Sequence, residues 1–369
     1  MQSQYSQIPR PRYPTSQYPI IHLFPGQGDF SAGALVRALR EHAVLRASVA
    51  EVFEHVDAVG AQHGIAPLGP TLCGNEPPGS RQLAAGPRGT LQLAAFGASM
   101  AVHRALVQIG LAPARVFGVS FGEIAAATAA GVFGLVDGAE IAYQLARVLP
   151  HGRGGLTLLA AGETQARALI AALADRRLVL ACVNAPDETL LCGPLAVLDE
   201  LELLAAQRGL TTHRLRLPFP SHHPDLAVEA HAFRASMRDI RAMPPLAPVY
   251  SAVHGDVYGP DDDVRQGLAN CLTRPALVPA ALRRVTGDAP ALLLEAGTGD
   301  ALARAAERSL AEYESGYETN DDTECGLDDA VSGWPRSVVR APIADLSFPW
   351  DEPEQLTAYA LRARSGSCR

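Results

Sequence analysis

The sequence predicts an α/β protein built from a parallel sheet, with a smaller α/β unit inserted into it. Short apolar strands alternate with helical patterns between residues 20 and 149, and again between residues 249 and 295. This order is typical of a parallel sheet covered by helices. Residues 155–217 instead follow the order βαββαβ. With 369 residues, of which 48% are hydrophobic, the chain is long enough to bury a large core.

The larger unit is expected to contain four strands, each a short apolar run bounded by glycine, proline or polar residues. They are expected at residues 20–24, 114–117, 249–253 and 291–295. The segments between them carry apolar residues at helical spacing. Helices are therefore expected at residues 34–60, 90–110, 124–130, 135–149, 264–272 and 276–285.

The inserted unit is expected to contain two helices and four strands. The helices are expected at residues 163–174 and 195–207, and the strands at residues 156–160, 178–184, 188–192 and 211–217. A turn at Asn184-Ala185-Pro186-Asp187 joins the middle pair of strands. This order is the ferredoxin-like plan. An insert of this kind would form one wall of a cleft.

Four segments follow from this order. Residues 1–19 are polar and proline-rich, and we expect a disordered lead. Residues 20–154 and 218–310 form the larger unit, and residues 155–217 form the insert. Residues 311–369 begin with an acidic, glycine-containing stretch typical of a linker. The tail that follows contains Phe348 and Trp350, which we expect to dock on the body.

Composition excludes several classes of function. The formal net charge is −8 and basic residues are not clustered, so we expect no nucleic-acid partner, although a local arginine patch could attract an acidic carrier protein. No apolar run reaches the about 18 residues of a membrane span. The six cysteines lie far apart without a CxxC pair, which indicates neither a metal site nor disulfides. We expect a cytoplasmic monomer.

The run Gly118-Val119-Ser120-Phe121-Gly122 has the G-x-S-x-G pattern of a nucleophile elbow. A strand is predicted before it and a helix after it, as that turn requires. We expect the two glycines to permit a sharp turn that projects the serine oxygen above the sheet. The helix can offer backbone N–H groups to developing negative charge. The alternative is an ordinary loop beside a core helix.

A serine hydroxyl needs a base that removes its proton during attack. His222 and His223 are the best candidates, because they lie where the chain returns from the insert to the larger unit. Histidine accepts a proton near neutral pH. A structural or surface role for this pair is the alternative.

Taken together, these residues resemble the malonyl-CoA:acyl-carrier-protein transacylases and the acyltransferases of modular polyketide synthases. The resemblance covers about residues 20–310. It rests on an ordered set of motifs: Phe24-Pro25-Gly26-Gln27-Gly28, residues 118–123, the hairpin from Asn184-Ala185-Pro186 to Gly193, Pro220-Ser221-His222, and Glu295-Ala296-Gly297-Thr298-Gly299. The family's fold, an α/β-hydrolase-like subdomain with a ferredoxin-like insert, agrees with the order of elements.

The resemblance implies that Ser120 attacks an acyl thioester, and that His222 is first a general base and then a general acid toward the leaving thiol. The backbone N–H groups of Gln27 and Phe121 would form the oxyanion hole. In this family a backbone carbonyl orients the histidine, and its offset before the proline points to Cys271. No metal or bound cofactor is implied. The acyl group would arrive on CoA or on the phosphopantetheine of an acyl carrier protein. The resemblance implies this carrier and a polyketide synthase as partners.

Three departures from the malonyl pattern surround the implied acyl pocket. Leu145 stands where malonyl-type enzymes have an arginine that grips the substrate carboxylate. Arg147 lies about 200° farther round the helix and would face away. Val119 replaces a histidine before the nucleophile, and Phe219-Pro220-Ser221 matches neither signature of malonyl or methylmalonyl selection. The other expected pocket residues are Gln144, Asn184 and His223.

We therefore expect a free-standing acyltransferase that moves a monocarboxylic, aromatic or aminoacyl group onto or between acyl carrier proteins in polyketide-type biosynthesis. One alternative is an acyl hydrolase that clears stalled groups from carriers. Another is a malonyl-type enzyme with a relocated carboxylate contact. The others are a catalytically silent docking subunit and an ordinary α/β-hydrolase that uses Asp187 as its acid.

Overall fold

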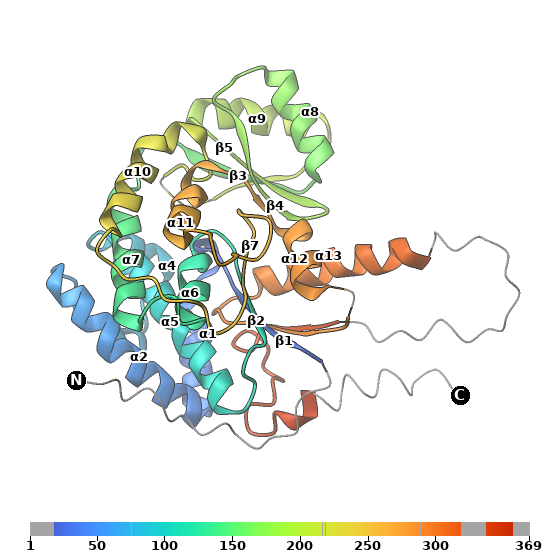
Figure 1. Ribbon diagram of the computed structural model, residues 1–369. Coiled ribbons are helices and arrows are strands. Elements are labelled where there is room, and N and C mark those ends of the chain that lie inside the picture. The colour runs from blue at the N-terminus through green and yellow to red at the C-terminus, as the bar shows by residue number, and fades with distance from the viewer. Residues whose placement is uncertain are drawn as a thin grey trace, which may run out of the picture.

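Two five-stranded sheets organise the chain (Figure 1). The computed structural model describes residues 18–74, 76–215, 217, 219–287, 289–318 and 337–356. Sheet A belongs to the larger subdomain, and sheet B lies above it in Figure 1 within the smaller subdomain. The expected α/β plan, with a parallel sheet in a larger subdomain and an inserted smaller subdomain, is confirmed.

Sheet A is parallel and has the strand order β10-β9-β1-β2-β7. In that order the strands span Val338–Arg340, Leu292–Glu295, Ile20–Phe24, Arg115–Gly118 and Val249–Ser251. Side chains alternate between the two faces of a strand. Accordingly, Ile20 and Phe24 of β1 enter one buried apolar cluster, whereas Ile21 and Leu23 enter another.

Helices cover both faces of sheet A, and Figure 1 shows the two groups on opposite sides. On the Phe24 face, the cluster contains residues of α1 (Ala32–Glu41), α2 (Ala43–Gln62), α3 (Leu68–Leu72), α4 (Ser80–Ala85), α5 (Thr90–Gln108), α6 (Gly122–Ala129), α7 (Leu135–Val148), α10 (Ala227–Ser236) and α11 (Val264–Thr273). On the Leu23 face, it contains residues of α12 (Val278–Thr286) and α13 (Ala301–Glu318). The larger subdomain is thus a three-layer α/β unit.

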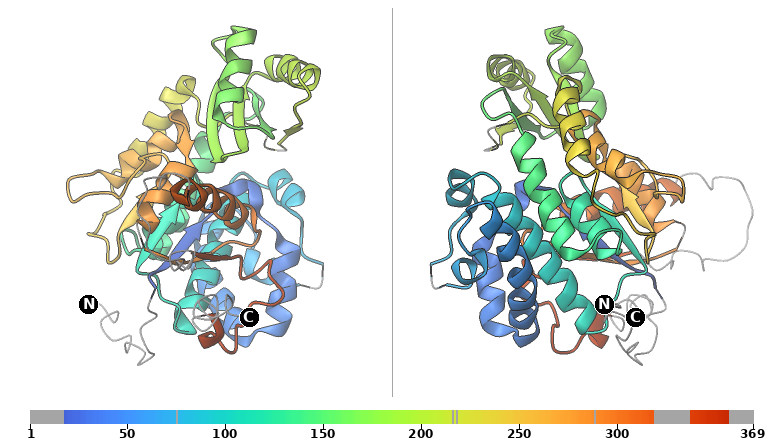
Figure 2. Two further views of the ribbon diagram at one scale, coloured as in Figure 1. Left: turned by 90° about the vertical axis from the view of Figure 1, so that its right-hand side faces the viewer. Right: turned by 60° about the vertical axis from the view of Figure 1, so that its left-hand side comes forward.

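Sheet B has the order β6-β3-β5-β4-β8 and realises the expected βαββαβ plan. Its strands span Thr212–Arg214, Gly155–Leu159, Glu188–Gly193, Val179–Ala185 and Ala276–Leu277 in that order. The last of these, β8, comes from outside the insert and pairs in parallel with β4. The helices α8 (Glu163–Leu173) and α9 (Leu195–Gln207) pack on one face of the sheet around a separate apolar cluster (Figure 2).

Several elements differ from their predicted form. The helix expected at residues 34–60 is divided into α1 and α2 by His42, whose extended backbone ends the first helix. The short helix α3 was not predicted because it contains Gly69 and Pro70, both poor helix formers. Strand β6 ends at Arg214, short of the predicted residue 217. Helices α4 and α10, and the short 3-10 helices Gln27–Asp29 and Pro224–Leu226, were also not predicted.

The C-terminal segment contributes to the larger subdomain. Helix α13 extends to Glu318, so it runs into the stretch that was expected to be a linker from residue 311. Strand β10 extends sheet A beyond β9. Phe348 and Trp350 are buried in the main cluster and contact each other edge to face, which confirms the expected docking of the tail. The remainder of the expected linker, residues 319–336, and residues 1–17 of the expected lead lie outside the described residues.

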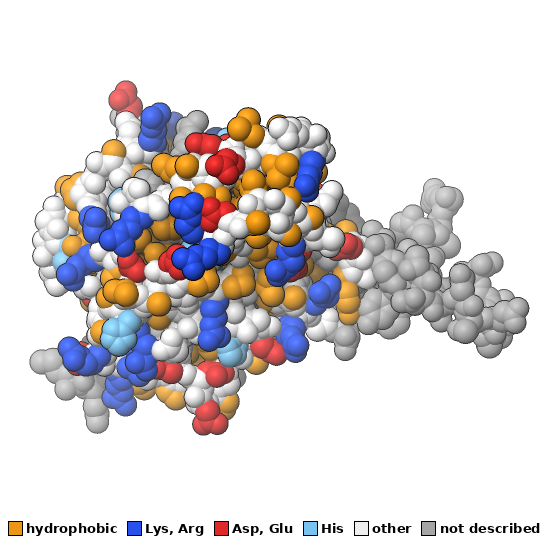
Figure 3. Space-filling model, turned by 90° about the horizontal axis from the view of Figure 1, so that it is seen from above, with side chains coloured by type: hydrophobic (Ala, Val, Ile, Leu, Met, Phe, Trp, Pro, Cys, Tyr) orange, Lys and Arg blue, Asp and Glu red, His pale blue; other side chains and the backbone are white. Residues whose placement is uncertain are grey.

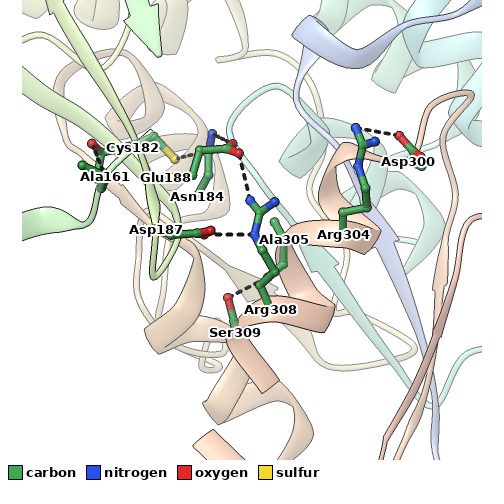
Figure 4. Close-up of polar contacts among 11 residues, drawn as sticks. Ala161, Cys182, Asn184, Asp187, Glu188, Asp300, Arg304, Ala305, Arg308 and Ser309 are labelled. Carbon is green, nitrogen blue, oxygen red and sulfur yellow. Dashed lines mark hydrogen bonds and ion pairs between the residues drawn. The ribbon is translucent and has the colours of Figure 1, made fainter. Parts of the chain in front are cut away.

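Arg308 of α13 joins the two subdomains (Figure 4). Its guanidinium contacts Asp187 (3.0 Å) and Glu188 (2.8 Å) at the tip of the β4–β5 hairpin. The second oxygen of Glu188 accepts a hydrogen bond from the Asn184 side-chain amide (2.9 Å). The carbonyl end of Asn184 accepts a hydrogen bond from the Cys182 thiol. One chain of polar contacts therefore runs from sheet B to helix α13.

Seen from above, the molecule carries basic and acidic side chains that are interspersed with hydrophobic groups (Figure 3). No helix among the described residues is long and apolar enough to cross a membrane. The same residues contain no group of three or more His, Cys, Asp or Glu that could hold a metal ion.

Candidate active site

Ser120 lies at the turn between β2 and α6 and has a positive φ of +56°. The Val119 N–H donates to the carbonyl oxygen of Phe24 (3.1 Å), and the Gly122 N–H donates to that of Val119 (3.0 Å). These bonds hold the main chain on both sides of the serine. A positive φ is strained for a residue with a Cβ and persists only where its surroundings enforce it. This is the geometry of the predicted nucleophile elbow.

The two glycines of the elbow serve close packing. Neither Gly118 nor Gly122 has a positive φ; Ser120 itself adopts it, and the glycines permit the turn by leaving room for the main chain beside them. An added Cβ at Gly122 would lie 2.1 Å from the carbonyl oxygen of Phe24. At Gly118 it would lie 2.6 Å from Cα of Glu123. Glycine is therefore required because α6 packs directly against the ends of β1 and β2.

The structure brings His222 to Ser120. The distance between His222 Nε2 and Ser120 Oγ is 2.8 Å. His222 also has a positive φ, +56°, and is buried. Its Nδ1 lies 2.7 Å from the carbonyl oxygen of Arg274. Because a carbonyl only accepts, Nδ1 carries the proton, which leaves Nε2 free to accept from the serine hydroxyl. This is the tautomer that a general base needs.

The carbonyl that orients His222 belongs to Arg274, so the assignment to Cys271 was wrong. Cys271 lies in the last turn of α11, where backbone carbonyls point along the helix axis. Arg274 is the C-cap residue and has an extended backbone (φ −113°, ψ 148°), which turns its carbonyl out of the helix. Pro275 follows, and a residue before proline favours this conformation.

Within the described part of the chain, the His222 ring meets the Arg274 carbonyl and Ser120 and no carboxylate. Burial lowers the pKa of His222 below the ordinary histidine value, although the hydrogen bond to the Arg274 carbonyl opposes this effect. The neutral imidazole is therefore the prevailing form at neutral pH. Asp187, the acid of the α/β-hydrolase alternative, pairs with Arg308 on the β4–β5 hairpin instead.

We expect the rate of serine acylation to remain high below the pH at which an ordinary histidine gains its proton. Lowering the pH charges His222 and removes the base, and a lowered pKa moves this loss to more acidic pH. The acid limb of kcat/KM should therefore have its midpoint below about pH 6.5. Acylation rates measured from pH 4.5 to 8 would show this. Melting curves at each pH would separate unfolding from protonation, and a midpoint above 7 would contradict the expectation.

Gln27 and Phe121, the expected oxyanion-hole residues, belong to segments that lie close to Ser120. A Cβ added at Gly26 would come within 4.0 Å of Ser120 Cβ, so the Gly26-Gln27 turn packs against the serine. Gly26 and Phe121 line one small cavity, which brings the two segments together. The Gln27 side chain is held by Gln92, whose amide donates to its carbonyl oxygen (2.9 Å).

The Glu295–Gly299 motif packs against the same turn from the other side. An added Cβ at Gly297 would lie 2.5 Å from the Pro25 ring, and one at Gly299 would lie 2.1 Å from the Asp29 carboxylate. Asp29 also accepts a hydrogen bond from the N–H of Ala301 at the start of α13 (2.7 Å). The late glycine motif thus fixes the turn that carries Gln27.

Glu123, the residue after the elbow, anchors helix α6. Ser251 donates to one of its carboxyl oxygens (2.7 Å) and Tyr258 to the other (3.0 Å). Burial raises the pKa of Glu123 to about 7, and both hydrogen bonds oppose this rise. The carboxyl group therefore ties the helix behind Ser120 to strand β7 and the segment that follows.

Three of the expected pocket residues have other partners. Gln144 lies on the outer side of α7, where its amide bonds Glu140 and Arg147. His223 is buried: its Nδ1 accepts from the Asp225 N–H, so Nε2 donates to the Arg177 carbonyl in the smaller subdomain. Both amide atoms of Asn184 are engaged in the chain that leads to Arg308. These side chains hold structure together, and the hydrogen bonds described for them do not include one to Ser120.

The other expected pocket residues are buried and apolar. Leu145 belongs to the main cluster together with Phe219. Val119 belongs to the cluster that contains Cys182 and Ala252. The guanidinium of Arg147 bonds Gln144 on the exposed side of α7, so it faces away from Leu145, as the helical rotation predicted.

A cavity of about 190 Å³ has Gln92 and Phe219 among its lining residues. It lies between the loop that leads into α5 and the segment just before His222. The residues that line it are Leu83, Ala84, Gly86, Pro87, Arg88, Gly89, Leu91, Gln92, His151, Leu217 and Phe219. Gln92 connects this cavity to the Gln27 turn, and Phe219 connects it to the base.

Sequence reasoning missed Gln92 and the carbonyl of Arg274. Gln92 did carry a signal, because it is a single amide in the otherwise apolar first turns of α5. A buried amide usually has a polar partner. The carbonyl of Arg274 gave no signal in the sequence, because every residue has a backbone carbonyl. Only the way in which α11 ends decides where this carbonyl points.

Comparison with known proteins agrees with this geometry. The sequence profile of the acyl transferase domain matches residues 21–324. The chain belongs to the acyl transferase domain family. It is therefore an acyltransferase, and the serine–histidine pair lies within the matched region.

Relatives of this acyltransferase occur within much longer proteins. Erythronolide synthase EryA3 of Saccharopolyspora erythraea is 31% identical over 239 residues, which cover 64% of this chain and 7% of that protein. The spectinabilin polyketide synthase system protein NorA' of Streptomyces orinoci is 29% identical over 303 residues, 77% of this chain and 8% of that protein. The chain thus spans less than a tenth of the length of either.

Solved structures share the fold. The acyltransferase domain from module 8 of the salinomycin polyketide synthase aligns with a TM-score of 0.69 and 26% identity, over 80% of this chain and 68% of that one. The malonyl-CoA:acyl carrier protein transacylase of Xanthomonas oryzae aligns with a TM-score of 0.70 and 25% identity, over 82% of this chain and 98% of that one. The loading acyltransferase of the avermectin modular polyketide synthase aligns with a TM-score of 0.74 and 19% identity, over 93% of this chain and 99% of that one.

Proposed function

We propose that this acyltransferase moves an acyl group without the malonyl carboxylate onto or between acyl carrier proteins of polyketide-type biosynthesis. The observation that carries the chemistry is the 2.8 Å contact between Ser120 Oγ and His222 Nε2, with the opposite ring nitrogen held by Arg274. The observation that carries the substrate class is a buried leucine, Leu145, at the position where malonyl-type relatives have an arginine.

The first half-reaction forms an ester on Ser120. His222 Nε2 takes the hydroxyl proton while Oγ attacks the thioester carbonyl. The Gln27 and Phe121 N–H groups would donate to the oxyanion that forms. When this intermediate collapses, the carbon–sulfur bond breaks, and His222 returns its proton to the leaving thiolate. The acyl group is then held as an ester, and the thiol is released.

The second half-reaction reverses these steps with a different thiol. The phosphopantetheine thiol of a carrier protein gives its proton to His222 and attacks the ester carbonyl. Collapse breaks the bond to Ser120 Oγ, which takes the proton back. The name of the Xanthomonas oryzae relative, a malonyl-CoA:acyl carrier protein transacylase, supports a carrier as acceptor. Incubation of the acyl-enzyme with and without a carrier protein distinguishes a transferase from a hydrolase. Rapid loss of the acyl group to water, without a carrier, would favour a hydrolase.

Leu145 argues against malonyl as the substrate. Its side chain is 8% exposed and belongs to the main apolar cluster. A carboxylate buried beside it would lose its hydration without gaining an ionic partner, which is costly. The nearest guanidinium on the helix, that of Arg147, bonds Gln144 on the exposed side. The substrate is therefore expected to have apolar atoms where malonyl has its carboxylate.

We expect Leu145→Arg to raise malonyl loading relative to acetyl loading. One hydrogen-bonded charge pair contributes about 1.5–3 kcal/mol, so the ratio should rise about tenfold or more. The measurement is the mass of the Ser120 adduct when both donors compete. Leu145→Met is the matched control, because it keeps the volume and adds no charge, and its ratio should match that of the native protein. An unchanged ratio in a folded Leu145→Arg protein would contradict the proposed role of this position.

A further inference from the structure

The cavity lined by Gln92 and Phe219 has both apolar and polar lining residues, with Arg88 at its exposed side. Its walls include the buried side chains of Leu83, Leu91 and Phe219. Its mouth is formed by exposed residues, among them Arg88 and His151. The volume of about 190 Å³ exceeds the about 150 Å³ of an apolar cavity that accepts benzene. A ring or a branched chain of that size therefore fits between these walls.

Arg88 is held in place at the mouth without an acidic partner. Its Nη1 donates to the main-chain carbonyl of Arg147 at the end of α7 (2.9 Å). Among the described residues, no carboxylate lies within ion-pair distance of Arg88. A guanidinium has five N–H donors in a fixed plane, so this single bond orients the group and leaves donors available. Such a group binds a carboxylate well.

His151 adds a second polar group to the same mouth. Its ring lies against that of Phe219, with the ring centroids 5.4 Å apart. Phe219 in turn lies three residues before His222. The cavity is therefore continuous with the segment that carries the base, and Gln92 connects its wall to the turn that carries Gln27. An acyl group bound to Ser120 could extend into this space.

We propose that this cavity holds the body of the acyl group, and that Arg88, with His151 beside it, binds a carboxylate at the end remote from the thioester. This inference rests on the proposed function and narrows its substrate class. The acyl group would have apolar atoms next to the reacting carbonyl, where Leu145 lies, and a negative charge about one ring length away. Malonyl does not meet this description, because its carboxylate lies one carbon from the thioester.

An anion at Arg88 could also be the phosphate of the pantetheine arm. The side chains of Leu83, Leu91 and Phe219 favour the acyl group, because they offer no hydrogen-bond partner to the two amides of the pantetheine arm. Thioesters of N-acetylcysteamine contain no phosphate, so donors of this kind separate the two sources.

The test compares three such donors: benzoyl, 4-carboxybenzoyl and 4-(methoxycarbonyl)benzoyl thioesters. The third matches the shape of the second but carries no charge. The rate of Ser120 ester formation would be followed by intact mass. We expect the carboxylate to react about tenfold or more faster than its methyl ester in the native protein, as one charged hydrogen-bonded contact provides. In Arg88→Leu this ratio should fall to about one, and Arg88→Lys should keep part of it.

Arg147→Leu is the matched control, because it removes a neighbouring arginine whose guanidinium bonds Gln144 and leaves the backbone carbonyl that holds Arg88. Its ratio should equal that of the native protein. Equal rates for the two para-substituted donors in the native protein would overturn the inference, as would a ratio that Arg88→Leu leaves unchanged. If Arg88→Leu slowed ester formation from acyl-CoA but not from these phosphate-free donors, Arg88 would be assigned to the phosphate. That result would also overturn the inference. If no donor forms an ester on Ser120, the proposed function itself fails.

Discussion

Ser120→Ala should abolish the acyl-enzyme while leaving the fold intact. The variant removes the oxygen that lies 2.8 Å from His222 Nε2. Without it no ester can form at this position. In a serine hydrolase, loss of the nucleophile lowers kcat by about 10⁶-fold. A comparable loss is expected here, because the same oxygen forms and breaks the bond to the acyl carbon.

The measurement is intact-mass spectrometry after incubation with a panel of acyl-CoA and acyl-carrier donors. Native protein should gain the mass of the acyl group, and Ser120→Ala should not. Ser221→Ala is the matched control, since Ser221 directly precedes the base and has no role in the proposed chemistry. Its adduct should persist. An adduct of equal yield on Ser120→Ala would show that another residue is the nucleophile.

Gly122→Ala should destabilise the protein strongly and displace the nucleophile as well. The added Cβ would lie 2.1 Å from the carbonyl oxygen of Phe24 and 2.5 Å from that of Pro25. Both are main-chain atoms at the end of β1, so no side chain can rotate to relieve the contact. Overpacking of this kind costs about 1–3 kcal/mol and sometimes more. We expect about 3 kcal/mol here, together with slower acylation, because α6 must shift and Ser120 precedes it.

Unfolding in urea, followed by circular dichroism, would give the change in free energy of unfolding. Gly33→Ala is the matched control, because this glycine lies in α1 with no atom near the position of an added Cβ. Alanine is the better helix former, so this control should be unchanged or slightly more stable. If Gly122→Ala were as stable as Gly33→Ala, the close packing of the elbow against β1 would not hold in solution.

The sequence was most informative where chemistry depends on residue type at a fixed spacing. Gly118-Val119-Ser120-Phe121-Gly122 identified the elbow, and the strand and helix around it followed from the composition of the flanking segments. The βαββαβ order of the smaller subdomain was also evident from periodicity, and sheet B has it. The helix rotation correctly placed Arg147 away from Leu145.

Sequence reasoning failed where a contact depends on the direction of the main chain. It assigned the orienting carbonyl to Cys271, whereas the end of α11 presents that of Arg274. It placed His223 and Asn184 in the acyl pocket, although their polar atoms bond the backbone of Arg177 and the side chain of Glu188. A side chain's type says that it needs a partner, but only its surroundings say which one.

The sequence by itself determined the two-subdomain α/β plan, the serine elbow and the candidate base, because each depends on local pattern. The tertiary structure alone decided that His222 rather than His223 meets Ser120, and that Arg274 orients it across a separation of 52 residues. It alone placed Arg88 and Phe219 on one cavity. The physical reason is that these contacts join segments distant in sequence, whose approach is fixed by the packing of whole helices and sheets rather than by the residues that finally touch.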